Sequence, residues 1–325
     1  MTSRWKCFLV ASALTMYSCG YLTAEVADES RTRAGDVLFQ QFETVAYAST
    51  DVLTRFQKPG AKEPQSDVSL KLPIALRLPF VQLIGGLRIL GQTAMVDLER
   101  NYSGVLVGAT GFIPPDGFGM VSSLDCYVAL LRPDGQPLAE SVFGQAELKS
   151  IDGIRVWAWS APPYEGYPHI TNFYASEIDN QYLVISNDLS HFTDTVRKLA
   201  TVISIKAPKV GNREPFTTDK YWLYRPVQWG ETTPNIDATK SPEGRLSALV
   251  LKFSADADGM KCRMEVDGSS DLTETVRKGL PGSDVLHYEP TADGVWQASF
   301  PLSKDPATTT TLFRVLSLFG FGVNL

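Results

Sequence analysis

The sequence predicts an α+β protein in which helices pack on antiparallel sheets, after a helical N-terminal segment. Short β-type runs separated by turn residues dominate the chain from Ser103 onward. Apolar residues at three-and-four spacing mark helices both before these runs and directly after position 187. A short stretch that repeats 80 positions later raises a finer alternative, two related β-β-α units.

Two helical regions are expected before the strands. Between Asp36 and Phe56 the apolar residues have the spacing of one helix face, and Pro59-Gly60 ends it. The run from Leu72 to Met95 predicts one or two buried helices, broken near Pro79 and Gly85-Gly86. A membrane span is disfavoured in this run because arginine is costly at the bilayer centre, and it contains Arg77 and Arg88.

The β-type runs are short and turn-bounded, which favours an antiparallel sheet. They are Gly104–Phe112, Cys126–Leu131, Ile154–Trp159, Asn172–Glu177 and Gln181–Ser186. Pro133-Asp134-Gly135 is a strong turn signal, and Ala292-Asp293-Gly294 indicates a late hairpin. Asn187 or Asp188 then caps a helix whose apolar face includes Phe192 and Val196.

The repeat pairs Phe192–Lys198 with Leu272–Lys278, and the preceding strands align at the same offset. Duplication of a strand, turn, strand, helix unit explains the match. The alternative is that helix starts favour these residue types anyway.

The composition of Lys206–Pro215 indicates a linker. We therefore expect a signal segment at 1–20, an N-terminal α+β domain at 28–205, a linker at 206–216 and a C-terminal α+β domain at 217–325.

The N-terminus is typical of a signal for export. Arg4 and Lys6 precede the apolar stretch Cys7–Tyr17, which is too short to span a bilayer, and Ser18-Cys19-Gly20 offers small residues for cleavage. Met16–Cys19 also resembles a bacterial lipobox, although Met16 and Tyr17 depart from it, so cleavage and lipidation at Cys19 stay open. The expected location is periplasmic, membrane-tethered as a lipoprotein, or secreted.

The excess of acidic over basic residues limits the partners that the protein is expected to bind. Loss of Arg4 and Lys6 would reduce the 30 basic residues to 28, against 36 acidic residues. No basic cluster could follow a phosphate backbone, so nucleic acid is not an expected partner, and a membrane is expected only through an N-terminal lipid anchor. Cys126 and Cys262 lie in strand-like runs and either form one disulfide or are buried without pairing.

Catalytic motifs are scarce. The chain has no Gly-x-Ser-x-Gly elbow, phosphate-binding Gly-rich loop, His-Glu-x-x-His or Cys-x-x-Cys, and no cofactor is expected. The weak catalytic candidates are His191 with Asp188 and Asp194, three residues away on either side, which could share a helix face; a capped helix start explains the same residues.

No metal site is predicted. His169 could approach His191 if the sheet folds back, but the pair has no third ligand in view. Asp256-Ala-Asp258-Gly259 has the wrong spacing for a calcium loop, because the glycine comes fourth instead of sixth. A tight hairpin turn explains these residues better.

An aromatic cluster is the predicted ligand-binding surface. Strand alternation puts Arg155, Trp157 and Trp159 on one face and Ile154, Val156 and Ala158 on the other. Tyr164 and Tyr167 follow in a loop. Aromatic rows beside arginine can stack on sugar rings or hold an apolar partner, unless helices cover that face and the tryptophans are core.

These observations favour an exported, non-catalytic protein that binds a ligand or plays a structural part in the cell envelope. The expected partner is an envelope polysaccharide or another protein. The alternative is an envelope hydrolase that uses a histidine and carboxylate pair around His191.

Overall fold

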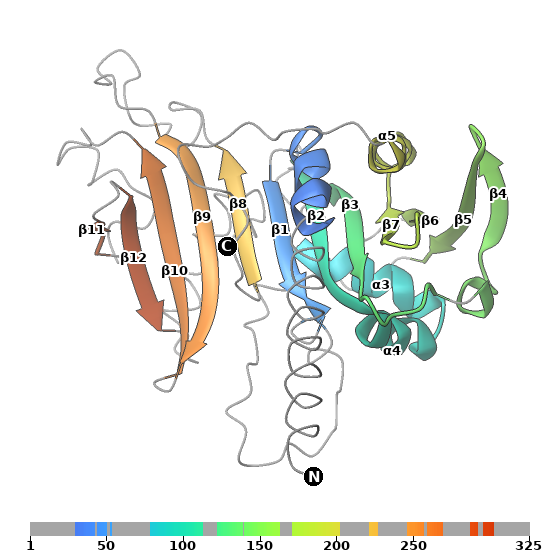
Figure 1. Ribbon diagram of the computed structural model, residues 1–325, viewed down its shortest axis with the longest axis horizontal. Helices are drawn as coiled ribbons and strands as arrows, with labels where there is room; N and C mark the ends of the chain where they lie inside the picture. Colours follow the sequence, from blue (N-terminus) through green and yellow to red (C-terminus); the bar gives the residue numbers. More distant parts are fainter. Residues whose placement is uncertain are drawn as a thin grey trace, which may run out of the picture.

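One antiparallel sheet of twelve strands organises the described chain. The computed structural model describes residues 30–42, 44–50, 53, 79–112, 122–138, 140–162, 171–201, 221–226, 246–256, 259–268, 287–291 and 295–301. The strand order is β11-β12-β10-β9-β8-β1-β2-β3-β7-β6-β5-β4, and the sheet runs across Figure 1 from β11 and β12 to β4. The predicted α+β class is therefore confirmed, with strand as the dominant element.

The strands are β1 (Thr44–Ser49), β2 (Tyr102–Phe112), β3 (Ser122–Leu131), β4 (Glu147–Ile151), β5 (Ile154–Ala161), β6 (Thr171–Ile178), β7 (Tyr182–Ser186), β8 (Tyr221–Pro226), β9 (Leu246–Asp256), β10 (Gly259–Gly268), β11 (Glu289–Pro290) and β12 (Trp296–Pro301). The helices are α3 (Val81–Ile89), α4 (Gln92–Asn101), α5 (Leu189–Ala200) and the 3-10 helix η2 (Glu140–Phe143). Residues 30–39 are also helical. In the described part of the chain, the helices are too short or too polar to cross a membrane.

The two faces of the sheet bury separate cores. On the helix-pair face, α3 and α4 cover strand residues that include Val107, Trp159 and Phe173. On the α5 face, α5 and residues 30–39 cover strand residues that include Cys126 and Val128. Figure 1 shows α3 and α4 beside the lower part of the sheet and α5 above β6 and β7.

The predicted helix from Asp36 to Phe56 is wrong in its middle, because residues 44–49 form β1. This strand lies between β2 and β8. Val45 and Tyr47 join the α5 face, whereas Ala46 and Ala48 join the helix-pair face. A strand that is buried on both faces has no polar alternation, so its apolar residues matched a helical spacing.

The predicted helix break near Gly85-Gly86 is also wrong. Helix α3 passes through Gly85 and Gly86 and ends before Gly91, whose φ of 107° only glycine adopts without strain. Gly86 permits close packing instead, because a Cβ there would lie 2.8 Å from the Phe173 ring. Residues 72–78 lie outside the described residues.

The later predictions of local structure are confirmed. The five β-type runs correspond to β2, β3, β5, β6 and β7, and Asp188 is the N-cap of α5. The turn at Pro133 is closed by the Gly135 N–H, which donates to the Arg132 carbonyl over 3.0 Å. Strands β9 and β10 meet in the predicted tight hairpin, with Asp256 paired to Gly259.

Strands from both predicted domains join in the one sheet, because β1 pairs with β2 on one side and with β8 on the other. The predicted linker at 206–216 lies outside the described residues, as does the second repeat at 272–278. The division into domains at 28–205 and 217–325 stays a prediction.

Candidate functional site

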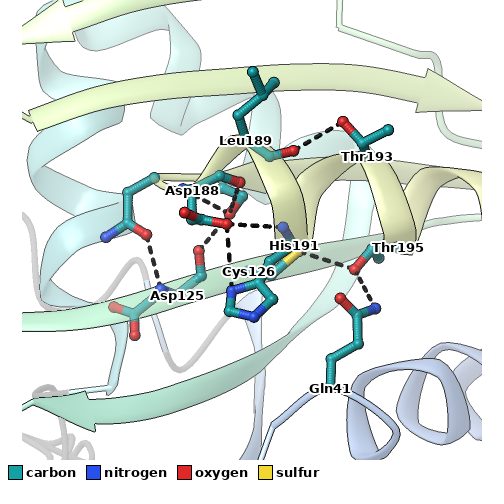
Figure 2. Close-up of polar contacts among 10 residues, drawn as sticks. Gln41, Asp125, Cys126, Asp188, Leu189, His191, Thr193 and Thr195 are labelled. Carbon is teal, nitrogen blue, oxygen red and sulfur yellow. Dashed lines mark hydrogen bonds and ion pairs between the residues drawn. The ribbon is translucent and has the colours of Figure 1, made fainter. Parts of the chain in front are cut away.

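The start of α5 brings Asp188 and His191 together. Asp188 has extended backbone angles, and its Oδ1 accepts a hydrogen bond of 2.8 Å from the His191 backbone N–H. The His191 ring Nδ1 lies 3.5 Å from the same oxygen (Figure 2). A side-chain oxygen that accepts from the third residue of a helix satisfies one of the free N–H groups of the first turn. The carboxylate therefore caps the helix.

The third predicted member of this site is engaged elsewhere. Asp194 Oδ2 lies 2.7 Å from Lys198 Nζ, one helical turn further on. The His191 ring packs against Phe42, with the ring centroids 4.7 Å apart. Asp188 and His191 thus form a pair, while Asp194 takes part in a separate surface ion pair of α5.

A second polar group lies below this pair, between α5 and β3. The Gln41 side-chain amide donates to Thr195 Oγ1 over 2.8 Å, and the Cys126 thiol donates to the same oxygen over 3.5 Å (Figure 2). Burial raises the pKa of the Cys126 thiol to about 12. Because the thiolate is the nucleophilic form, this cysteine is unreactive near neutral pH.

Sequence reasoning missed the most buried carboxylate of the region, Asp125. Only 2% of this residue is exposed. Its Oδ2 accepts from the Tyr127 hydroxyl over 2.9 Å, and its backbone N–H donates to Asn187 Oδ1 over 2.8 Å. The Asn187 amide in turn donates to Gln82 Oε1 of α3. The network therefore links α3 to the adjacent strands β3 and β7.

One sequence signal could have indicated this network. Asp125 directly precedes the apolar run Cys126–Leu131, and a carboxylate at the edge of a buried strand needs hydrogen-bond partners. The distant partners could not be predicted, since Asn187 reaches Asp125 because β3 pairs with β7, and Gln82 reaches Asn187 from α3.

The predicted aromatic surface is corrected, because Trp157 and Trp159 are core residues with 6% and 7% exposure. Trp157 stacks on Phe143 with centroids 4.4 Å apart, and Trp159 stacks on Phe173 at 5.5 Å. The Trp159 ring N–H donates to the Gly86 carbonyl over 3.0 Å. The predicted alternation holds, but α3 and η2 cover this face.

The other residues of the aromatic cluster do not restore a surface site. Arg155 is exposed, and its guanidinium lies 5.2 Å from the Trp157 ring centroid. Tyr164, Tyr167 and His169 lie outside the described residues, so the loop and the predicted approach of His169 to His191 are not described. Among the described residues, no three His, Cys, Asp or Glu side chains are grouped to hold a metal ion.

The disulfide between Cys126 and Cys262 is also corrected. Both cysteines are free and buried. They lie on β3 and β10, which are separated in the sheet by β9, β8, β1 and β2, and they belong to different faces. Strands lie about 4.8 Å apart, so more than about 20 Å separates these positions, whereas a disulfide requires Cα atoms within about 7 Å.

The half-buried carboxylate of Glu177, on β6, lies close to the turn before η2. The pKa of Glu177 is raised, chiefly because burial disfavours the charged carboxylate; the Leu138 backbone N–H and the Arg155 charge act in the opposite direction. Burial, together with the Glu177 charge, also raises the pKa of the Tyr102 hydroxyl. This pair lies apart from the start of α5.

Comparison with known proteins gives little further information. No protein-family model matches the chain, and no curated protein matches it. The chain matches a solved structure described as "Structure of crystal form I of TP0453" with a TM-score of 0.42 and 9% sequence identity; the match covers 87% of this chain and 97% of that one.

Proposed function

We propose that this chain is an exported, non-catalytic protein of the cell envelope that binds a partner or plays a structural part there. The observation that carries the proposal is that the carboxylate of Asp188, one of the catalytic candidates in the sequence, caps α5 by accepting from the His191 backbone N–H. The cap, the Phe42 contact of the histidine ring and the high pKa of the Cys126 thiol support structural roles for the reactive groups around α5.

Export is supported by the sequence signal at Arg4, Lys6 and Cys7–Tyr17. Mass spectrometry of the mature N-terminus, after cell fractionation, tests it. We expect the first 18 residues to be absent, with either a lipid-modified Cys19 or a free N-terminus after Gly20. The variant Cys19→Ala separates the two, since it abolishes membrane tethering only if Cys19 carries lipid. An intact Met1 in the cytoplasmic fraction would contradict export.

The alternative function is an envelope hydrolase that uses His191 and Asp188. The 3.5 Å separation of the ring Nδ1 from the carboxylate favours it, because a carboxylate can orient a histidine that acts as a base. Hydrolysis of a panel of ester, amide and glycoside substrates tests this function, with His191→Ala and the matched surface variant Asp194→Ala. Activity that His191→Ala abolishes and Asp194→Ala retains would replace our proposal.

For the partner, we propose another protein of the envelope in preference to a polysaccharide. The burial of Trp157 and Trp159 removes the aromatic surface that argued for sugar binding. Retention of the purified chain on envelope polysaccharides tests this choice. Binding that persists in Arg155→Ala and is competed by soluble sugar would favour the polysaccharide.

We also propose that two related β-β-α units are present, one formed by β6, β7 and α5 and the other by β9, β10 and residues 272–278. The two antiparallel hairpins at the repeat offset support this, although the second turn has two residues and the first has three. The variants Val196→Pro and Val276→Pro test it, because proline in a helix interior costs about 3 kcal/mol. Tolerance of Val276→Pro alone would argue against duplication.

A further inference from the structure

The two edges of the sheet differ in a way that distinguishes one of them as an interaction surface. At one edge, β11 has two residues, and one of them is Pro290, which lacks a backbone N–H. At the other edge, β4 has five residues, of which the first four are exposed (Figure 1). Short strands and proline protect an edge from pairing with another chain. The β11 edge is protected in this way, and β4 leaves a full strand accessible.

The turn between β4 and β5 determines which backbone groups of β4 face outward. Ile151 and Ile154 are paired across a two-residue turn, in which Asp152 and Gly153 have φ values of 52° and 80°. In such hairpins the flanking pair exchanges both backbone hydrogen bonds, and the pattern then alternates along the ladder. Because of this alternation, the N–H and C=O groups of Leu148 and Ser150 point away from β5.

The side chains of β4 are complementary to a second copy of the same strand. Leu148 is 54% exposed and lies opposite Trp157 on the helix-pair face. Glu147 and Lys149 flank it, with side chains 70% and 44% exposed, and within the strand Lys149 Nζ lies 2.8 Å from Glu147 Oε2. An antiparallel pair centred on Leu148 places Glu147 opposite the partner's Lys149 and Lys149 opposite the partner's Glu147. It also places Leu148 opposite the partner's Leu148, next to the Trp157 core.

Other registers lack this match. A pair centred on Lys149 places two lysines directly opposite each other, which is destabilising, and a pair centred on Glu147 does the same with two carboxylates. The register centred on Leu148 also agrees with the backbone, since the outward groups of Leu148 can bond those of the partner's Leu148. The register centred on Leu148 therefore combines backbone hydrogen bonds, charge pairing and apolar contact.

We propose that β4 is a dimerisation strand, which pairs antiparallel with β4 of a second copy in the register centred on Leu148 and extends the sheet across the two-fold axis. The proposal goes beyond the envelope function and does not depend on export. A single short strand buries less surface than a permanent interface, so the dimer dissociates on dilution. The partner is a second copy of this chain.

Sedimentation of the full chain over a range of concentrations, combined with charge reversal, tests the proposal. The variant Lys149→Glu places carboxylates opposite each other, and Glu147→Lys does the same with ammonium groups. Each raises the dimer dissociation constant by about tenfold or more, because two attractive cross-strand pairs become repulsive. The double variant, Glu147→Lys with Lys149→Glu, restores complementarity and dimerisation. An equimolar mixture of the two single variants also associates.

Hydrogen exchange of the Leu148 amide gives an independent measurement, since it becomes protected only in the dimer. A chain that sediments as a monomer throughout the concentration range would overturn the proposal. Association that Lys149→Glu leaves unchanged, or that the double variant fails to restore, would overturn it as well, because that association would use another surface. Recovery in the mixture cannot arise from misfolding of the single variants.

Discussion

The two sites expected from the sequence lie on opposite faces of the sheet and are held by different kinds of contact. On the helix-pair face, Trp157 and Trp159 are stacked on neighbouring aromatic rings, and Trp159 adds one hydrogen bond to α3. On the α5 face, polar side chains mark where helices begin and end. Asp188 caps the start of α5, and the Arg33 guanidinium donates to the Leu199 carbonyl at its end over 2.7 Å.

This difference explains why the sequence suggested two separate sites. The tryptophans suggested a binding surface because nothing in the sequence identifies α3, far away along the chain, as their cover. The histidine suggested chemistry because the spacing of a capped helix start matches that of an orienting carboxylate. Removal of a buried tryptophan should therefore cost more stability than removal of the cap of α5.

The largest effect is expected at Trp159. Replacement by alanine removes the Phe173 stack and the bond to Gly86, and it should lower the free energy of unfolding by about 3–5 kcal/mol, as for other buried aromatic residues. Urea unfolding measures it. The matched variant Trp159→Phe keeps a stacked ring and should cost less. A loss below about 1 kcal/mol for the alanine variant would contradict the core role of this face.

A smaller loss is expected at Gly86, where α3 packs against the Phe173 ring of β6. A Cβ there would lie 2.8 Å from the Phe173 ring, so Gly86→Ala should cost about 1–3 kcal/mol through overpacking. Repeating the substitution in a Phe173→Leu background is the control. The second loss should be smaller, since the two residues are in contact and their effects are not additive. Equal losses in both backgrounds would place the strain elsewhere.

The N-terminus of α5 should respond more weakly still. Asp188→Ala removes the cap and should cost about 1 kcal/mol. Asp194→Ala removes only an i,i+4 surface pair with Lys198, worth about 0.3–0.5 kcal/mol. Thermal unfolding of both variants measures the difference. A larger loss for Asp194→Ala would show that the cap does not anchor this helix.

Much of the fold could be predicted where strands alternate and turns carry Gly, Pro, Asn or Asp, as in β5, β6, β7 and the cap of α5. Two strands, β1 and β4, were not predicted, for opposite reasons. Strand β1 is buried on both faces, and β4 is exposed along most of its length, so neither has one apolar and one polar face. The Asp125 network was missed because Asn187 reaches Asp125 only through the pairing of β3 with β7.

The smallest predicted effect concerns Glu177, whose raised pKa makes the stability of the protein depend on pH. Burial disfavours its ionised form, so in the native state the carboxyl keeps its proton to a higher pH than in the unfolded chain. The native state then binds more protons in that window, and stability falls as the pH rises above the unfolded value of about 4.3. Glu177→Gln removes this penalty and retains an acceptor for Leu138.

We therefore expect Glu177→Gln to stabilise the protein at pH 7 by less than about 1 kcal/mol, since the side chain is only half-buried and Arg155 offsets part of the cost. At pH 4 the difference should vanish, because the carboxyl is then largely protonated in both states. Urea unfolding at the two pH values measures this change, with Glu99→Gln, exposed on α4, as the matched control. If Glu177→Gln destabilises the chain at pH 7, the Arg155 attraction outweighs burial, and this carboxylate stabilises the sheet in its charged form.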